Sequence, residues 1–279
     1  MRRFNKVAII GVGEIGGSIG KDLRRKRLAK EVIGIGRRES SLRKAKIVGA
    51  VDRTTLSLKN GVRDADFIIL ATPVLKIVEL GRKAARFAKE GAIMTDAGST
   101  KKYIVEKLEK ALPERVKFVG SHPMAGSEKG GPLSATNNLF KNRVCFVTGT
   151  GRTDKKALGV VKRFWRNLGA KVVEISPDKH DSITAQVSQM VHLVASSLVI
   201  SNKKVLKYTA SGFRDTTRIA LADSGLWIDI CATNSKEIAK SLDETIRILK
   251  KFKSAVAGKK VTQLQGMLNQ ARELRKSIK

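Results

Sequence analysis

The chain of 279 residues has few cysteines, few aromatic residues and no long uninterrupted apolar run. Cys145 and Cys231 lie far apart and outside any metal-ligand pattern, which argues against a disulfide framework and a cysteine-based metal site. The short apolar run after the basic N-terminus soon meets Glu14, so it predicts a first strand rather than a signal peptide, and no apolar run is long enough to cross a bilayer. We therefore expect a reduced, cytoplasmic protein with no membrane partner and no metal site.

Acidic residues are also scarce, since 25 Asp and Glu residues face 56 Lys and Arg residues and give a formal net charge of +31. Such a charge is compatible with nucleic-acid binding. However, the basic residues are spread over many segments, aromatic residues make up only 5% of the chain, and no recognised nucleic-acid motif accompanies them. We interpret the charge as solvated helix faces and a field that attracts anionic ligands, and we expect no nucleic-acid partner.

The most informative stretch joins an apolar run, residues 7–10, to a glycine-rich turn that opens a helix. The turn has the pattern G-x-G-x-x-G and comprises Gly11, Val12, Gly13, Glu14, Ile15 and Gly16. Gly11 allows a tight turn out of the strand, Gly13 lets a pyrophosphate approach the backbone, and Gly16 lets the helix lie against the sheet. The first N–H groups of the helix favour negative charge, so the stretch predicts a dinucleotide-binding site. The alternative is a glycine turn in another kind of α/β protein.

Strand-like segments alternate with helix-like segments up to about residue 175. The expected strands are residues 7–10, 31–36, 67–71, 92–95, 116–120, 143–148 and 171–175. This alternation predicts an α/β fold, with a Rossmann-type doubly wound parallel sheet over residues 1–175. Strand signals then fade, and residues 182–205, 225–252 and 261–278 are expected to be helical. Because the first of these helices is apolar on most sides, we predict that it is buried, either in a helical domain or in a dimer interface. We assign residues 176–279 to an all-helical substrate and dimerisation domain, with a homodimer as the expected assembly.

The end of the second expected strand indicates which dinucleotide is bound. About twenty residues past the glycine turn, NAD-binding sites place an acidic residue for the ribose 2′-hydroxyl. Here the chain reads Gly36-Arg37-Arg38, and two guanidinium groups can clamp a 2′-phosphate, so we predict NADP, with NAD as the second option because Glu39 follows. The alternative is a pair of solvated loop arginines. Thr72 and Pro73 follow another strand and are also predicted to contact the cofactor.

Only three histidines are present, and His122 is the best candidate for acid–base chemistry. It follows an expected strand in a loop rich in Gly, Ser and Pro, where an imidazole can take a hydroxyl proton as hydride leaves. Ser99 ends a neighbouring strand and can orient the ring, and Ser99 or Thr100 can cap the following helix. The alternative is a histidine that only holds its own loop. His180 is expected to be structural, and His192, taken alone, resembles a core histidine on an apolar helix.

A second polar stretch, residues 212–220, contains Arg214, Asp215 and Arg218. Arg214 and Arg218 are separated by four residues and are expected on one helix face, while Asp215 and Arg218 can pair. A guanidinium that points into a cleft would bind a substrate carboxylate through two hydrogen bonds. The alternative is a surface ion pair with no role in function.

These motifs together define a resemblance. The matching stretches are residues 11–18, 71–74, 96–101, 120–128 and 212–220, with Trp227 and Asp229. Within them, the His-Pro-Met-Ala-Gly-Ser-Glu and Phe-Arg-Asp-x-Thr-Arg-Ile-Ala runs are far more specific than the glycine turn. From about residue 6 to about residue 249, the chain resembles the prephenate and arogenate dehydrogenase family of tyrosine biosynthesis.

The resemblance implies a Rossmann domain followed by a helical dimerisation domain. It also implies oxidative decarboxylation of a small anionic substrate, prephenate or arogenate, with hydride transfer to NAD(P). By this match, His122 hydrogen-bonds the ring hydroxyl, Ser99 positions His122, and Arg218 binds a substrate carboxylate. The residues that match further parts of the substrate site are His192, Asp215 and Trp227; Arg214 is added from its helix face.

One part of the match is incomplete. Where the family has Ser-His-x-Pro-His, this chain reads Ser188-Gln189-Met190-Val191-His192. Gln189 and Val191 thus replace a histidine and a proline, which leaves substrate preference and local helix geometry open.

Two other classes are weighed against this interpretation. Another two-domain reductase, of the β-hydroxyacid dehydrogenase or imine reductase type, would use a catalytic lysine or another acid in the helical domain. A non-catalytic dinucleotide sensor or nucleic-acid-binding protein would retain DNA in a salt-sensitive way and would not turn over a substrate.

Overall fold

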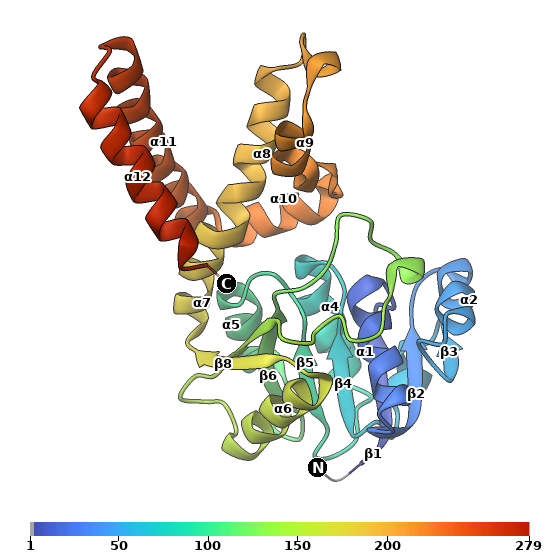
Figure 1. Ribbon diagram of the computed structural model, residues 1–279. Coiled ribbons are helices and arrows are strands. Elements are labelled where there is room, and N and C mark those ends of the chain that lie inside the picture. Colours follow the sequence, from blue (N-terminus) through green and yellow to red (C-terminus); the bar gives the residue numbers. More distant parts are fainter. Residues whose placement is uncertain (1–2, 279) are drawn as a thin grey trace. The chain divides into compact units, whose positions relative to one another are not determined.

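The structure is a computed structural model that describes residues 3–278. Within these residues, eight strands form one sheet in the order β3-β2-β1-β4-β5-β6-β7-β8 (Figure 1). The strands are β1 (Phe4–Ile10), β2 (Ala29–Ile35), β3 (Arg53–Thr55), β4 (Phe67–Leu70), β5 (Ile93–Asp96), β6 (Lys117–Pro123), β7 (Val144–Thr148) and β8 (Lys171–Ile175). This order places the topological switch point between β1 and β4, where doubly wound sheets bind their ligands. The predicted fold class is confirmed, and β3 is a strand that the sequence pattern did not indicate.

One strand pair departs from the expected parallel sheet. β6 and β7 are antiparallel, with His122 opposite Phe146, whereas the other recorded pairs are parallel. Parallel neighbours need a crossover connection that is usually a helix, but the chain from β6 to β7 contains only the short 3₁₀ turn Pro132–Ser134. The antiparallel pairing extends β6 to Pro123, so His122 lies within a strand and not in the loop that we expected after it.

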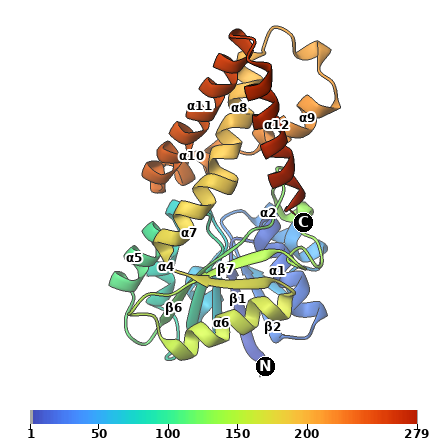
Figure 2. The same cartoon turned by 60° about the vertical axis from the view of Figure 1, so that its left-hand side comes forward.

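Six helices flank the sheet. They are α1 (Glu14–Arg25), α2 (Glu39–Ile47), α3 (Leu58–Val62), α4 (Val74–Ala85), α5 (Lys102–Ala111) and α6 (Lys155–Leu168). α1 packs beside α6 and α4 packs beside α5, and Figure 2 shows the sheet between these helices. Local sequence sets the ends of α6, because the Asp154 carboxylate accepts the Ala157 N–H and Gly169 takes the left-handed conformation after the last turn. The apolar faces meet in a core around Ile9, Phe67 and Trp165.

The rest of the chain is helical, as predicted, but more interrupted. The segments are α7 (Pro177–Thr184), a π-helical turn (Ala185–Gln189), α8 (Met190–Ser201), 3₁₀ turns (Leu206–Tyr208 and Arg218–Leu221), α9 (Ser211–Thr217) and α10 (Ser224–Thr233), followed by α11 (Ser235–Ala257) and α12 (Val261–Lys276). By packing, the described residues up to Ser235 form one compact unit, and those from Lys236 onward form a second, which holds most of α11 and all of α12. The expected helix over residues 225–252 is therefore two helices that meet at Asn234.

The continuous run Pro177–Ser201 is long and apolar enough to pass a length-and-composition test for a membrane span, with a mean hydropathy of 1.4 in its most apolar window. Core helices of soluble proteins pass the same test. Although the helix is continuous, its first turns are polar and carry Asp178, Lys179, His180 and Asp181. His180 and Asp181 are buried and form hydrogen bonds with His122 and with the backbone of Lys101, so polar contacts within the protein hold this end of the helix.

Candidate active site

The glycine turn has the geometry that a pyrophosphate requires. Gly11 has a φ of +95°, and a side chain there would collide with the backbone of Ala71. A side chain at Gly16 would overlap the Gly11 carbonyl oxygen, so only glycine lets α1 approach the strand. By contrast, a Cβ at Gly13 would meet no atom within 4 Å, which leaves the backbone at the start of α1 open to a ligand. These positions fit the roles that we predict for the three glycines.

The neighbouring strand end also fits a dinucleotide. Thr72 and Pro73 lie between β4 and α4, beside the glycine turn at the switch point. Among the described residues, the buried hydroxyl oxygen of Thr72 has no hydrogen-bond partner, which is unusual for a buried polar atom and is explained if a ligand supplies the partner. Past β2, Arg37 and Arg38 are both exposed before α2 begins at Glu39, so their guanidinium groups are available to a phosphate.

His122 is buried on β6 and makes a ring-to-ring hydrogen bond with a residue expected to be structural. Its Nδ1 lies 2.9 Å from Nε2 of His180, the residue at the start of α7. Nδ1 of His180 lies 2.7 Å from an oxygen of Asp181. We call these three residues the His122–His180–Asp181 triad. It joins the sheet to α7 through side chains that are separated by 58 residues in the sequence.

The hydrogen bonds of the triad determine which nitrogen of each histidine ring carries the proton. Asp181 already accepts the backbone N–H groups of Lys101, at 2.7 Å, and Lys102, at 3.0 Å. An ionised Asp181 can only accept, so Nδ1 of His180 donates to it and Nε2 of His180 is the unprotonated nitrogen. His122 then donates from Nδ1 to His180, and Nε2 of His122 is left without a proton. His122 therefore presents a hydrogen-bond acceptor, the form that a general base needs.

Burial favours this neutral state of both rings. Burial lowers the pKa of His122 well below its ordinary value, and the neighbouring His180 and the positive charge of Lys101 lower it further. The pKa of His180 is also well below its ordinary value, because of burial and then Lys101. Burial raises the pKa of Asp181, and the backbone N–H groups of Lys101 and Lys102 oppose that rise.

A buried ion pair supports the same region. Lys101 and Asp96 pair with each other, and both side chains are fully buried. Asp96 also accepts the backbone N–H of Ser121 at 3.0 Å, one residue before His122. Burial raises the pKa of Asp96 and lowers that of Lys101, while the charge of each partner offsets the shift of the other. The pair thus ties the end of β5 to the strand that carries His122.

Ser99 lies in the segment between β5 and α5. Neither Ser99 nor Thr100 caps α5, contrary to expectation, because Asp181 accepts the first N–H groups of that helix from a distance of 80 residues in sequence. The Ser99 side chain is half-buried, and its carbonyl oxygen accepts a hydrogen bond from Gln189. No hydrogen bond joins Ser99 to His122 among the described residues, so the positioning role of its hydroxyl stays a prediction.

Arg218 forms an ion pair with Glu128, a residue of the loop that follows His122. The prediction that Arg214 and Arg218 share one helix face is wrong, because α9 ends at Thr217 and Arg218 begins a tighter 3₁₀ turn. Arg214 instead donates to the carbonyl of Thr209 at 3.0 Å. The predicted pair of Arg218 with Asp215 is also not formed, since Glu128 takes that place. Arg218 nevertheless remains 57% exposed, so an incoming carboxylate can reach it.

His192 and Trp227 stack face to face, with ring centroids 3.5 Å apart and an angle of 8° between the planes. Nδ1 of His192 is buried and, among the described residues, has no hydrogen-bond partner. Burial lowers the pKa of His192. A neutral ring with one unpaired nitrogen fits a residue whose partner is a substrate group, as the resemblance implies.

The two halves of the site are also connected directly. One oxygen of the Glu14 carboxylate accepts the Ser127 N–H at 2.9 Å, which ties the glycine turn to the loop after β6. Asp229 on α10 accepts the Leu75 N–H at 3.2 Å, so a helix of the C-terminal part caps α4 just past Thr72 and Pro73. These contacts hold the predicted cofactor and substrate residues within one compact unit.

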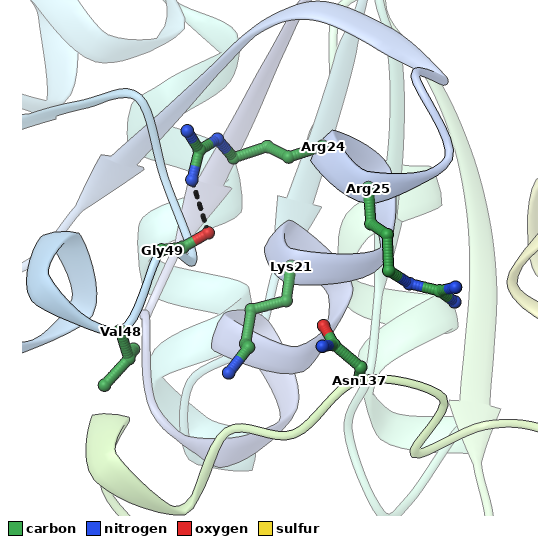
Figure 3. A pocket seen from close by; sticks show the side chains of 6 residues that line it. All are labelled: Lys21, Arg24, Arg25, Val48, Gly49 and Asn137. Carbon is green, nitrogen blue, oxygen red and sulfur yellow. Dashed lines mark hydrogen bonds between the residues drawn. The ribbon is translucent and has the colours of Figure 1, made fainter.

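A separate cavity of about 490 Å³ lies on α1 and contains none of these residues (Figure 3). Its lining comprises Lys21, Arg24, Arg25, Val48, Gly49 and Asn137. Arg24 donates to the Gly49 carbonyl at 2.6 Å and pairs with Asp52, so its charge is already used within the protein. Within residues 3–278, no cluster of three or more His, Cys, Asp or Glu residues is placed to hold a metal ion.

A glycine turn at the switch point of a doubly wound sheet, together with a buried neutral histidine, defines a class of protein, the NAD(P)-dependent dehydrogenases. Comparison with known proteins then identifies the family. Residues 19–174 match the family model described as prephenate dehydrogenase, nucleotide-binding domain, and residues 176–270 match that of the prephenate dehydrogenase dimerization domain. The chain belongs to the prephenate dehydrogenase family.

Individual relatives agree with the family match. The prephenate dehydrogenase of Bacillus subtilis (strain 168) is 34% identical over 280 residues, which cover 98% of this chain and 76% of that protein. The crystal structure of prephenate dehydrogenase from A. aeolicus, in complex with hydroxyphenyl propionate and NAD+, has a TM-score of 0.92 and 34% identity and covers 99% of this chain and 98% of that one.

Synechocystis arogenate dehydrogenase has a TM-score of 0.81 and 28% identity, over 97% and 99% of the two chains. These findings favour an enzyme of this family over the β-hydroxyacid dehydrogenase, imine reductase and sensor alternatives.

Proposed function

We propose that this chain oxidises and decarboxylates prephenate or arogenate with a nicotinamide dinucleotide, in tyrosine biosynthesis. The observation that carries the proposal is the hydrogen-bonded series His122–His180–Asp181, from which we infer that Nε2 of His122 is an acceptor. The loop that follows the strand of His122 contacts Glu14 at the glycine turn. A buried neutral imidazole suits a substrate whose hydroxyl proton must leave as the ring is oxidised. The excess positive charge of the chain and the exposed guanidinium of Arg218 suit an anionic substrate.

Each residue of the site has a separate role in the proposed reaction. A bound nicotinamide would supply the acceptor for the hydride of the ring carbon that bears the hydroxyl. His122 accepts a hydrogen bond from that hydroxyl and takes its proton, while His180 and Asp181 hold the ring in the required tautomer. The ring carboxylate leaves as carbon dioxide, and the ring becomes aromatic, which makes the step effectively irreversible. Ser99 is proposed to help position His122.

Substrate binding is assigned to the exposed end of the site. We propose that Arg218 binds a substrate carboxylate, with Asp215 and Arg214 shaping the approach from α9. The His192–Trp227 stack forms a flat wall, and the unpaired Nδ1 of His192 offers a hydrogen bond to a substrate polar group. Prephenate and arogenate differ in a side-chain keto or amino group, and both carry the ring hydroxyl and carboxylate on which this assignment depends.

We propose that the chain prefers NADP over NAD. Arg37 and Arg38 follow β2 where a 2′-phosphate would lie, and both side chains are exposed. The relative from A. aeolicus was solved with NAD+, so the preference is a property to measure in this chain. Changing both arginines to alanine should raise KM for NADP about tenfold or more and leave KM for NAD nearly unchanged, because charge-assisted hydrogen bonds to the phosphate are lost. An equal rise in KM for both cofactors would contradict the assignment of Arg37 and Arg38 to the 2′-phosphate.

We also propose a cytoplasmic homodimer that divides functionally at residue 175, with residues 1–175 binding the dinucleotide and residues 176–279 forming the interface. α12 buries none of its residues, and Val261, Leu268 and Leu274 are more than half exposed. Exposed apolar side chains on a helix are expected where a second subunit covers them. Light scattering coupled to gel filtration tests the mass, and a monomer at micromolar concentration would contradict the proposal.

A single set of assays tests the proposed function. NADP and NAD reduction are followed at 340 nm with prephenate and with arogenate, four combinations in all. We expect turnover with at least one substrate and a higher kcat/KM with NADP. Absence of turnover with both substrates, for protein that binds NADP and is folded, would overturn the proposed function.

A further inference from the structure

Gln189 occupies an unusual position next to the candidate active site. It is the last residue of the π-helical turn between α7 and α8, and its side chain is buried, with 2% exposed. A π-helical turn inside an α-helix is rare and frequently occurs at a functional site. The turn displaces this residue from the regular helix pattern, and the side chain reaches the segment that follows β5 rather than solvent.

Both the nitrogen and the oxygen of the Gln189 side-chain amide form hydrogen bonds. Its Nε2 donates to the carbonyl oxygen of Ser99 at 3.1 Å and to the hydroxyl of Thr184 at 3.2 Å. Its Oε1 accepts from Nδ2 of Asn234 at 2.8 Å. All three partners are held by the fold, so the amide is fixed in a single orientation.

Asn234 connects this amide to the triad. It lies between α10 and α11, is buried, and also donates to the backbone carbonyl of Asp181 at 2.9 Å. Asp181 in turn orients His180, and His180 bonds His122. Thr100 and Thr233 add a second contact, with their hydroxyls 3.0 Å apart, between the Ser99 segment and α10. The Ser99 segment, residues 97–102, is therefore joined to the Asp181 end of the triad by this pair of side-chain amides, in addition to the hydrogen bonds from the Lys101 and Lys102 N–H groups to Asp181.

We propose that Gln189, together with Asn234, is a positioning residue that fixes the Ser99 segment relative to the His122–His180–Asp181 triad. The inference rests on the proposed function. The link needs a donor toward Ser99 and an acceptor toward Asn234, and a glutamine amide supplies both without titrating, with a second N–H for Thr184. A neutral imidazole also supplies one of each, a protonated imidazole supplies only donors, and an ionised carboxylate supplies only acceptors.

These chemical differences give substitutions with opposite pH dependence. In Gln189→Met, the approximate shape is kept and all three hydrogen bonds of the amide are lost. We expect kcat to fall about 10- to 100-fold, the scale of a small misplacement of catalytic groups, with KM within about threefold of the wild type. In Gln189→Glu, kcat is low near pH 8 and partly recovers as the pH falls, because the protonated acid regains a donor. In Gln189→His, kcat is close to the wild type near pH 8 and falls as the ring gains a proton. Glutamine does not titrate, so neither pH trend is expected from residue 189 in the wild type.

Gln186→Met is the matched control. Gln186 lies on the same helical run, is exposed, and donates only to the Ser182 carbonyl at 3.0 Å. This variant should keep wild-type kcat and KM. If Gln189→Met also keeps wild-type kcat, or if Gln189→Glu and Gln189→His follow the same pH profile, the proposal is overturned. Should Gln189→Met fail to fold, the opposed pH profiles of the other two variants decide the question alone.

A readout that does not depend on turnover separates this inference from the proposed function. Hydrogen exchange of residues 97–102 should be faster in Gln189→Met than in the wild type or in Gln186→Met, because the Ser99 carbonyl loses its anchor. Wild-type protein that turns over neither substrate would contradict the proposed function, whereas unchanged exchange in Gln189→Met contradicts the inference.

Discussion

The two ends of the candidate site are built in different ways. At the His122 end, three ionisable side chains are buried and bonded in sequence, and the last of them also accepts the first N–H groups of α5. At the Arg218 end, the guanidinium is 57% exposed and pairs with one carboxylate at the edge of a loop. A buried polar network is costly to break because each orphaned group loses its partner and is shielded from water, whereas an exposed pair is replaced by water. The difference suggests chemistry at the buried end and capture of the substrate at the exposed end.

The largest effect should come from His122→Asn, which breaks the buried end at the proposed base. Asn cannot take a proton, so we expect kcat to fall by about 10²- to 10⁴-fold, the usual contribution of general acid–base catalysis. NADP affinity, measured by fluorescence titration, should be unchanged and serves as the control for an intact nucleotide site. Turnover close to that of the wild type would remove His122 from the mechanism.

A smaller loss is expected from His180→Phe. The ring of His180 packs edge-on against Phe146, with centroids 5.4 Å apart, so phenylalanine preserves the aromatic packing and removes only the nitrogens. His122 then loses its acceptor and its defined tautomer, and kcat should fall about 10- to 100-fold with little change in KM. A change confined to KM would mean that His180 contacts the substrate and does not position His122.

Arg218→Ala tests the exposed end. Loss of a charge-assisted hydrogen bond to the substrate carboxylate should raise KM for the substrate about tenfold, with kcat within about threefold of the wild type. Arg214→Ala is the comparison variant, because Arg214 already donates to the Thr209 carbonyl, and a smaller rise in KM is expected. If kcat falls and KM does not, Arg218 acts in the chemical step and the division between the two ends is wrong.

Much of the sheet domain could be predicted from the sequence because its signals are local. The glycine turn and the apolar strands each depend on neighbours a few residues away, and the structure places both as expected. The antiparallel edge was missed because nothing in the composition of β7 states the direction of its partner. That single pairing moved His122 from a loop into a buried strand.

The triad could not be predicted, because its parts meet only through tertiary packing. His180 looked structural at a helix start, and the one sequence signal for it was a charged Lys-His-Asp run at the beginning of an otherwise apolar helix. The capping of α5 by Asp181 replaced a local cap that Ser99 or Thr100 could have made. At the exposed end, Arg218 pairs with Glu128 of the loop after β6 and not with Asp215, a contact between residues that are 90 positions apart in the sequence.

The pH dependence of stability should report the buried end. Burial lowers the pKa of both His122 and His180 well below the ordinary value of 6.5, so the unfolded chain binds more protons than the folded one in acid. The contribution of these rings to stability is therefore complete above about pH 6.5 and is lost as the pH falls toward the folded-state pKa values. Each ring contributes a slope of up to about 1.4 kcal/mol per pH unit in that window. Urea unfolding at several pH values measures the slope of the free energy of unfolding against pH. We expect a smaller slope in His180→Phe than in the wild type. An equal slope in both proteins would contradict the assignment of this slope to the buried histidines.

The smallest effect should follow from Glu128→Gln, which breaks the ion pair at the exposed end. Water and the remaining amide replace most of what the exposed guanidinium loses, so the Tm should stay within about 2 °C of the wild type, whereas His180→Phe should lower it by more. Binding responds differently from stability here, because Arg218 released from Glu128 is free for the substrate carboxylate and KM should not rise as it does in Arg218→Ala. A loss of Tm in Glu128→Gln as large as that in His180→Phe would show that the loop after β6 is part of the folded core, and the contrast between a buried catalytic end and an exposed binding end would no longer hold.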